Sequence, residues 1–125
     1  MGNGELLGIA HVQLAAPPGC EARARKFFSG LLGLKEVKKP ENLRKRGGVW
    51  FQVGSQQLHI GVEREQDFHP NKKAHPAFKV SNLLALRERL ISKNVQVVDD
   101  EPLEGFDRFY VSDPFGNRLE FLEAT

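Results

Sequence analysis

The sequence predicts an α+β fold made of two tandem βαβββ modules, whose curved, cupped mixed sheets leave a concave face. The first observation is a repeated order of elements, because each half of the chain presents a strand, a helix, a strand, a loop and a hairpin. The second is length, since neither half of 125 residues can bury both a helix and a sheet alone. Each module is therefore expected to complete its core against another.

The composition is that of one ordinary globular domain covering residues 1–125. Hydrophobic residues make up 40% and charged residues 27%, and a net charge of +2 is too small to indicate nucleic acid or membrane as a partner. No run approaches the roughly 20 apolar residues of a membrane span, and the start lacks the pattern of a signal peptide. We therefore expect a cytoplasmic protein. The single Cys20 excludes an internal disulfide.

Module one is expected at about residues 8–62. Its predicted elements are a strand at 8–16, a helix at 21–32 and strands at 34–38, 49–53 and 56–62. The helix shows apolar residues at helical spacing, and Gly54-Ser55 is a plausible two-residue hairpin turn. If that turn is tight, Trp50 lies opposite His59 on the neighbouring strand.

Module two is expected at about residues 75–123, after a polar linker at about 63–74. Its predicted elements are a strand at 75–80, a helix at 82–92 and strands at 95–98, 109–111 and 118–122. Asp113-Pro-Phe-Gly-Asn117 supplies proline and glycine for the turn of the closing hairpin. Four strands are thus expected in each module.

Four side chains able to bind a metal lie at matching positions of the two modules. His11 is on the first strand of module one and His59 on its last, whereas His75 opens module two and Glu120 lies on its last strand. Strand alternation places Glu120 on the face opposite Leu119 and Phe121, where a covered carboxylate would be costly without a partner. The simpler explanation of Glu120 is that its face of the sheet is solvated. The more specific explanation is that Glu120 points into a cavity and binds a cation.

Three motifs carry a family resemblance. They are the opening His11-Val-Gln-Leu, a helix that contains Phe27-Phe28 and ends in Gly-Leu-Leu-Gly-Leu, and Asp-Pro-Phe-Gly-Asn-Arg-Leu-Glu-Phe near the C-terminus. Together they resemble the vicinal oxygen chelate superfamily over roughly residues 8–123. That superfamily includes glyoxalase I, fosfomycin-resistance and bleomycin-resistance proteins and type I extradiol dioxygenases. The resemblance implies this fold, a small-molecule substrate and a homodimer, with sites within one chain or shared across two.

The resemblance also implies a divalent metal ion bound by His11, His59, His75 and Glu120. Imidazoles and one carboxylate suit iron, zinc, nickel, cobalt or manganese better than calcium or magnesium. His59 and Glu120 are the expected catalytic residues. Glyoxalase I typically has Glu at the position of His59; a histidine there can still move protons, but metal coordination competes for its lone pair.

The expected function is that of a small metal-dependent enzyme, either a lyase or isomerase or a dioxygenase. Its substrate would chelate the metal through two adjacent oxygens. Trp50, Arg108 and Tyr110 are candidates for the substrate pocket, although a place in the core or at a dimer interface is an equal alternative for the two aromatic residues. The rival hypothesis is a metal-free protein that sequesters a small molecule, as bleomycin-resistance proteins do.

Overall fold

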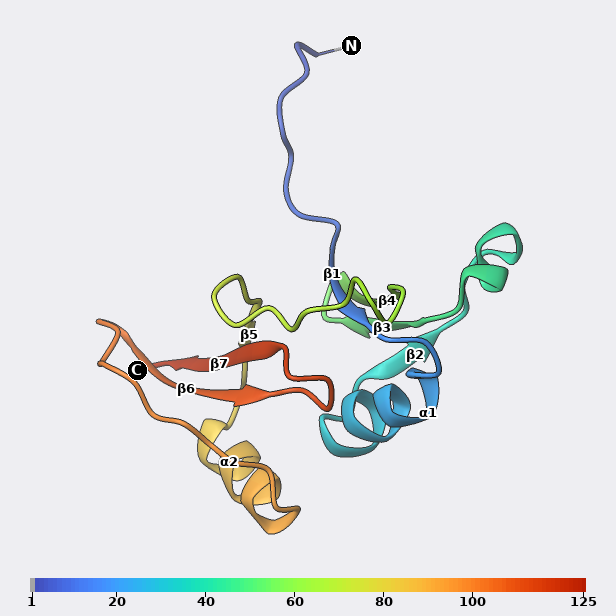
Figure 1. Cartoon of the computed structure of the whole chain (residues 1–125). Helices are drawn as coiled ribbons and strands as arrows, with labels where there is room; N and C mark the ends of the chain where they lie inside the picture. The colour runs from blue at the N-terminus through green and yellow to red at the C-terminus, as the bar shows by residue number, and fades with distance from the viewer. Residues whose placement is uncertain (1) are drawn as a thin grey trace.

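The computed structural model describes residues 2–125 and contains two sheets, each with a helical segment against one face (Figure 1). The elements, in order, are β1 (His11–Ala16), α1 (Glu21–Ala24), a π-helix η1 (Arg25–Leu31), β2 (Lys35–Val37), a 3-10 helix η2 (Glu41–Arg46), β3 (Val49–Val53), β4 (Gln56–Val62), β5 (Ala77–Lys79), α2 (Leu83–Ser92), β6 (Phe106–Ser112) and β7 (Arg118–Ala124). The first sheet has the strand order β1-β4-β3-β2 and the second β5-β7-β6. Mixed sheets with few helices agree with the predicted α+β class.

The first sheet packs one face against the helical segment formed by α1 and η1. β1 runs parallel to β4, and β3 runs antiparallel to it, so that Trp50 pairs with His59 as the sequence predicts. Alternation along β3 and β4 turns Phe51 and Leu58 toward the helix, where both are buried. The Phe51 ring lies 5.5 Å from that of Phe28. The opposite face is left to the polar residues of the same strands.

The second sheet has three strands, not the four expected. The predicted strand at 95–98 is wrong, because only Val98 forms a bridge, to Tyr110. The next residue, Asp99, accepts two hydrogen bonds from Arg87 of α2 at 2.7 and 2.9 Å. The chain then runs beside β6 to a second isolated bridge, between Leu103 and Phe106, without forming a continuous strand.

The turn of the closing hairpin joins the two sheets. Asn117 is 1% exposed, and its side-chain amide donates to the Ala15 carbonyl at 2.8 Å and accepts from the Asn71 amide at 3.0 Å. Within the turn, one Asp113 carboxylate oxygen accepts the backbone N–H groups of Phe115 and Asn117. Buried residues of both halves form one hydrophobic cluster. Each half therefore completes its core against the other.

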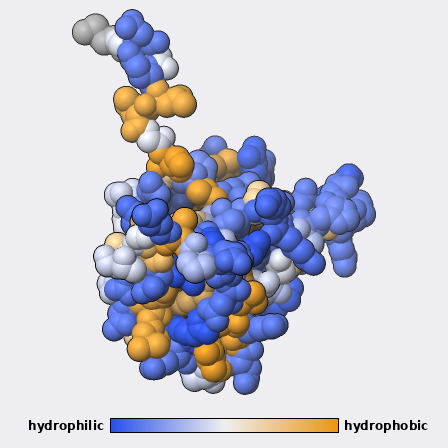
Figure 2. Space-filling view, turned by 90° about the vertical axis from the view of Figure 1, so that its left-hand side faces the viewer, coloured by the Kyte–Doolittle hydropathy of each residue, from blue (hydrophilic) through white to orange (hydrophobic). Residues whose placement is uncertain are grey.

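Residues 3–9, called the N-terminal arm below, extend away from the two sheets (Figure 1). Figure 2 shows hydrophobic side chains on this arm, and Leu6 and Leu7 are 97% and 98% exposed. Among the described residues, none of the helices has the length and apolar character needed to cross a membrane.

Candidate functional site

Three rings lie in a stack on the face of the first sheet that points away from its helix. The His11 ring lies 4.1 Å from that of His59, with 17° between their planes. The Trp50 indole lies on the other side at 3.8 Å and is parallel to the His59 ring within 1°. Neighbouring strands β1, β4 and β3 each contribute one ring, so the sheet fixes their order.

His59 is the most constrained member of this stack. It is 5% exposed, and its Nε2 atom lies 2.9 Å from Oε1 of Gln57. Burial, followed by the positive charges of His11 and Lys39, lowers the pKa of His59 from 6.5 to about 4. The imidazole is therefore neutral near pH 7, which is the form that binds metal ions.

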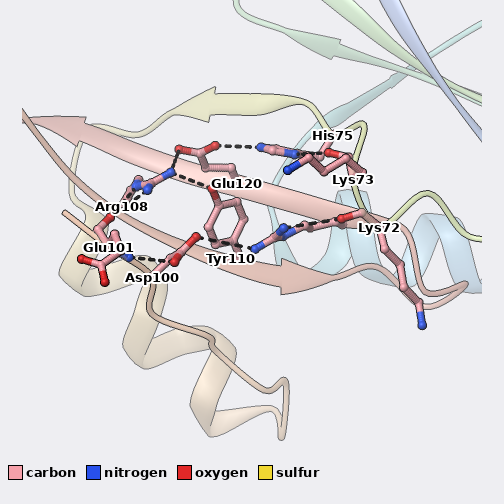
Figure 3. Close-up of polar contacts among 9 residues, drawn as sticks. Lys72, Lys73, His75, Asp100, Glu101, Arg108, Tyr110 and Glu120 are labelled. Carbon is pink, nitrogen blue, oxygen red and sulfur yellow. Dashed lines mark hydrogen bonds and ion pairs between the residues drawn. The ribbon is translucent and has the colours of Figure 1, made fainter. Parts of the chain in front are cut away.

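A polar network occupies the corresponding face of the second sheet (Figure 3). Nε2 of His75 lies 2.8 Å from Oε1 of Glu120, whose side chain is 8% exposed. Nη1 of Arg108 donates to the Tyr110 hydroxyl at 2.6 Å and to the other Glu120 oxygen at 3.3 Å. Tyr110 and Glu120 are paired residues of β6 and β7, so the strands set the spacing of this network.

The two nitrogens of His75 have distinct roles. Nδ1 lies 2.8 Å from the carbonyl oxygen of Lys73, and because a carbonyl can only accept, Nδ1 must carry a proton. In the neutral ring Nε2 then has a lone pair that faces the Glu120 carboxylate, and two acceptors at 2.8 Å repel each other unless a cation lies with them. A proton or a metal ion satisfies this pair. The donor set therefore fits a divalent metal.

The structure brings the predicted ligands together as two pairs. His11 lies beside His59 and His75 beside Glu120, but among residues 2–125 no three His, Cys, Asp or Glu side chains form a group able to hold a metal ion. The predicted pocket residues divide in the same way, Trp50 with the first pair and Arg108 and Tyr110 with the second. One chain thus carries the predicted ligands as two pairs on separate sheets, and each pair with its neighbours is called a half-site below because it contains two of the four predicted ligands.

Two neighbours were not singled out from the sequence. Gln57 contacts His59, and the Arg118 guanidinium lies 3.7 Å from the centre of the Tyr110 ring. Strand alternation could have indicated both, because each lies two positions from a predicted ligand on the same strand. The carbonyl of Lys73 could not have been found in this way, since a backbone group has no sequence signal.

The model of the Glyoxalase/Bleomycin resistance protein/Dioxygenase superfamily matches residues 8–121. The chain belongs to this superfamily. Its members commonly use divalent metals and often act as dimers on small molecules. No functionally curated protein matches the sequence.

Solved structures of superfamily proteins resemble the whole chain. A glyoxalase family protein from Bacillus anthracis is 50% identical, with a TM-score of 0.93 and coverage of 99% of this chain and 100% of that one. A lactoylglutathione lyase from Agrobacterium tumefaciens is 21% identical, with a TM-score of 0.71 and coverage of 93% and 92%. A fosfomycin resistance protein from Listeria monocytogenes is 15% identical, with a TM-score of 0.75 and coverage of 97% and 96%. The last two are similar in fold alone.

Proposed function

We propose that this chain is a metal-dependent enzyme of the superfamily, and that two chains together form each metal site. His11 and His59 of one chain and His75 and Glu120 of a second are the proposed ligands. The observation that carries this proposal is the pairing of the predicted ligands on each sheet, above all His75 and Glu120, whose Nε2 and Oε1 atoms lie 2.8 Å apart. Because the four ligands lie on two separate faces of one chain, a second copy is needed to unite them.

The bound metal would act as a Lewis acid toward a substrate that chelates it through adjacent oxygens. The residues around it have separable tasks. Lys73 holds the tautomer of His75 through its carbonyl, and Arg108 orients Glu120. The Tyr110 hydroxyl accepts from Arg108 and can donate its own proton to a substrate oxygen. In the half-site of the first sheet, Trp50 stacks on His59 and keeps water from one face of its ring.

Elemental analysis of protein purified without chelators tests the proposal. The wild-type dimer is expected to contain about one divalent metal ion per chain, and a His75→Ala, Glu120→Ala double variant to contain almost none. His69→Ala is the matched control, because His69 is exposed in the segment between the sheets. Metal content that survives in the double variant, or that disappears equally in the control, would contradict the proposed ligands.

The alternative of a metal-free binding protein has one observation in its favour. The stacked rings of His11, His59 and Trp50 form an aromatic surface on which a planar ligand could lie, and this surface needs no metal. Metal-free wild-type protein with an intact fold would favour this function.

The reaction type needs a second experiment. Protein reconstituted anaerobically with ferrous iron can be screened for oxygen uptake with a series of catechols. Uptake that depends on His75 would assign a dioxygenase, because His11, His75 and Glu120, taken without His59, are two histidines and a carboxylate, a set that leaves open positions on ferrous iron. Metal-loaded protein without uptake would favour a lyase or isomerase.

A further inference from the structure

The large hydrophobic side chains that remain exposed fall mainly into two groups. One group lies on the N-terminal arm, where Leu6, Leu7 and Ile9 are 97%, 98% and 65% exposed (Figure 2). The other, called the β6 patch, consists of Val98, Leu103 and Phe106, which are 45%, 40% and 36% exposed. Each exposed aliphatic side chain forgoes the free energy that its burial would release. Two such groups in one chain call for a common explanation.

The β6 patch borders the half-site of the second sheet. Val98 and Tyr110 form a bridge, and Leu103 and Phe106 form another. Phe106, Arg108 and Tyr110 alternate along β6, so their side chains lie on the same face of the sheet as Glu120, which pairs with Tyr110. Arg108 also donates to the carbonyl of Glu101 at 2.7 Å, which ties the loop that carries Leu103 to this face.

Both sheets have an unpaired edge next to their half-site. Within residues 2–125, β1 pairs only with β4, and β5 pairs only with β7. Because His11 and His75 hold matching positions, a site that unites them relates the two sheets by an approximate two-fold axis perpendicular to the strands. Such an axis places β1 of one chain beside β5 of the other and makes these strands antiparallel.

The direction of the arm follows from this geometry. The backbone that precedes His11 must then pass the C-terminal ends of β5 and β7 of the second copy. Phe106, the first residue of β6, lies at that end, because it pairs with Ala124 at the end of β7. From β1 to β6 of the second copy are three strand spacings, about 14 Å, and Phe106 lies four residues along the strands from the level of Glu120, about another 14 Å, so that the separation is about 20 Å. The five extended residues from His11 to Leu6 cover about 17 Å, and the leucine and phenylalanine side chains span the remainder. Leu6 and Leu7 therefore reach the edge of the β6 patch at Phe106.

We infer that the N-terminal arm of each chain packs Leu6 and Leu7 against the β6 patch of a second copy and closes the open end of the shared site. The inference rests on the proposed function in one respect, the pairing of half-sites from two chains. The contact between the arm and the β6 patch is additional, because the assignment of the metal ligands does not require it. The arm would exclude water from the end of the site at which Arg108 contacts Tyr110 and Glu120.

Sedimentation equilibrium of the full chain tests the contact. Leu6→Ser, Leu7→Ser is expected to weaken the dimer about a hundredfold or more, since two leucines are lost from each of two contacts. Leu84→Ser is the matched control, because Leu84 is 65% exposed on α2, outside both groups, and should leave the dimer unchanged. Equal dimer affinity in wild type and the arm variant, or an equal loss in the control, would overturn the inference.

Cross-linking identifies the partner surface. A Leu7→Cys chain mixed with a Leu103→Cys chain is expected to form a disulfide-linked dimer, while the native Cys20 is 0% exposed and does not interfere. Failure of this mixture to cross-link would place the arm elsewhere and overturn the inference. Metal content, measured separately, decides the proposed function: a cross-linked dimer without metal would retain the arm contact and reject the metal site.

Discussion

The two sheets surround their candidate ligands with different chemistry, aromatic on the first sheet and charged on the second. On the first, His59 lies between two aromatic rings and is kept neutral by burial. On the second, Glu120 is held by a guanidinium and an imidazole in a network of charges. The comparison teaches that one fold can present an aromatic histidine pair and a histidine–carboxylate pair on separate sheets. In the proposed site, the two pairs would be united between two chains.

The largest expected effect concerns the turn of the closing hairpin, which joins the two sheets. Asn117→Ala should lower the free energy of unfolding by about 3 kcal/mol, because it removes a buried amide and leaves the groups of Ala15 and Asn71 without partners. Urea denaturation should still show one transition for both sheets. Asn42→Ala, at an exposed position of η2, should change stability by less than about 0.5 kcal/mol. Two separate transitions in the wild type would show that the sheets fold independently.

The next effect concerns how the free energy of unfolding depends on pH through His59 of the first sheet. The pKa of His59 is about 4 in the folded chain and 6.5 ordinarily, so between these values the unfolded chain binds the proton more readily. Stability should therefore fall as pH decreases, with His59 contributing about 2 kcal/mol between pH 7 and pH 5. Urea titrations of wild type and His59→Gln at both pH values measure this contribution. An unchanged pH dependence in the variant would remove the distinction between a neutral and a charged face.

The smallest effect concerns the charged face. Arg108→Met should lower the midpoint of thermal unfolding, because the Glu120 carboxylate loses a partner in a region where the Arg108 and Glu120 side chains are 16% and 8% exposed. Arg87→Met is the control, since it breaks an ion pair with Asp99 whose side chains are 34% and 65% exposed and should lower the midpoint less. Both variants can be compared by thermal unfolding. Equal losses would indicate that burial does not strengthen the Arg108 contact.

The elements that local pattern specifies were predictable. The strands at 49–53 and 56–62 have the bounds expected from their alternation, and the facing of Trp50 and His59 follows from the two-residue turn between them. The helix at Leu83–Ser92 begins after Asn82, whose side chain accepts from the Ala85 amide. The absence of a strand at 95–98 was not predictable in the same way, because it depends on how this segment pairs with β6, where only Val98 forms a bridge, and β6 is distant in sequence.

The sequence by itself determined the superfamily fold and offered four side chains as candidate metal ligands, because strand alternation and matching positions are local properties of the chain. Only the tertiary structure showed that these side chains form two pairs on separate sheets, since that depends on how the modules pack. It also revealed the tautomer of His75, which a backbone carbonyl sets, and the desolvation of His59, which neighbouring rings produce. Packing across distant segments creates both effects, and no single stretch of sequence records them.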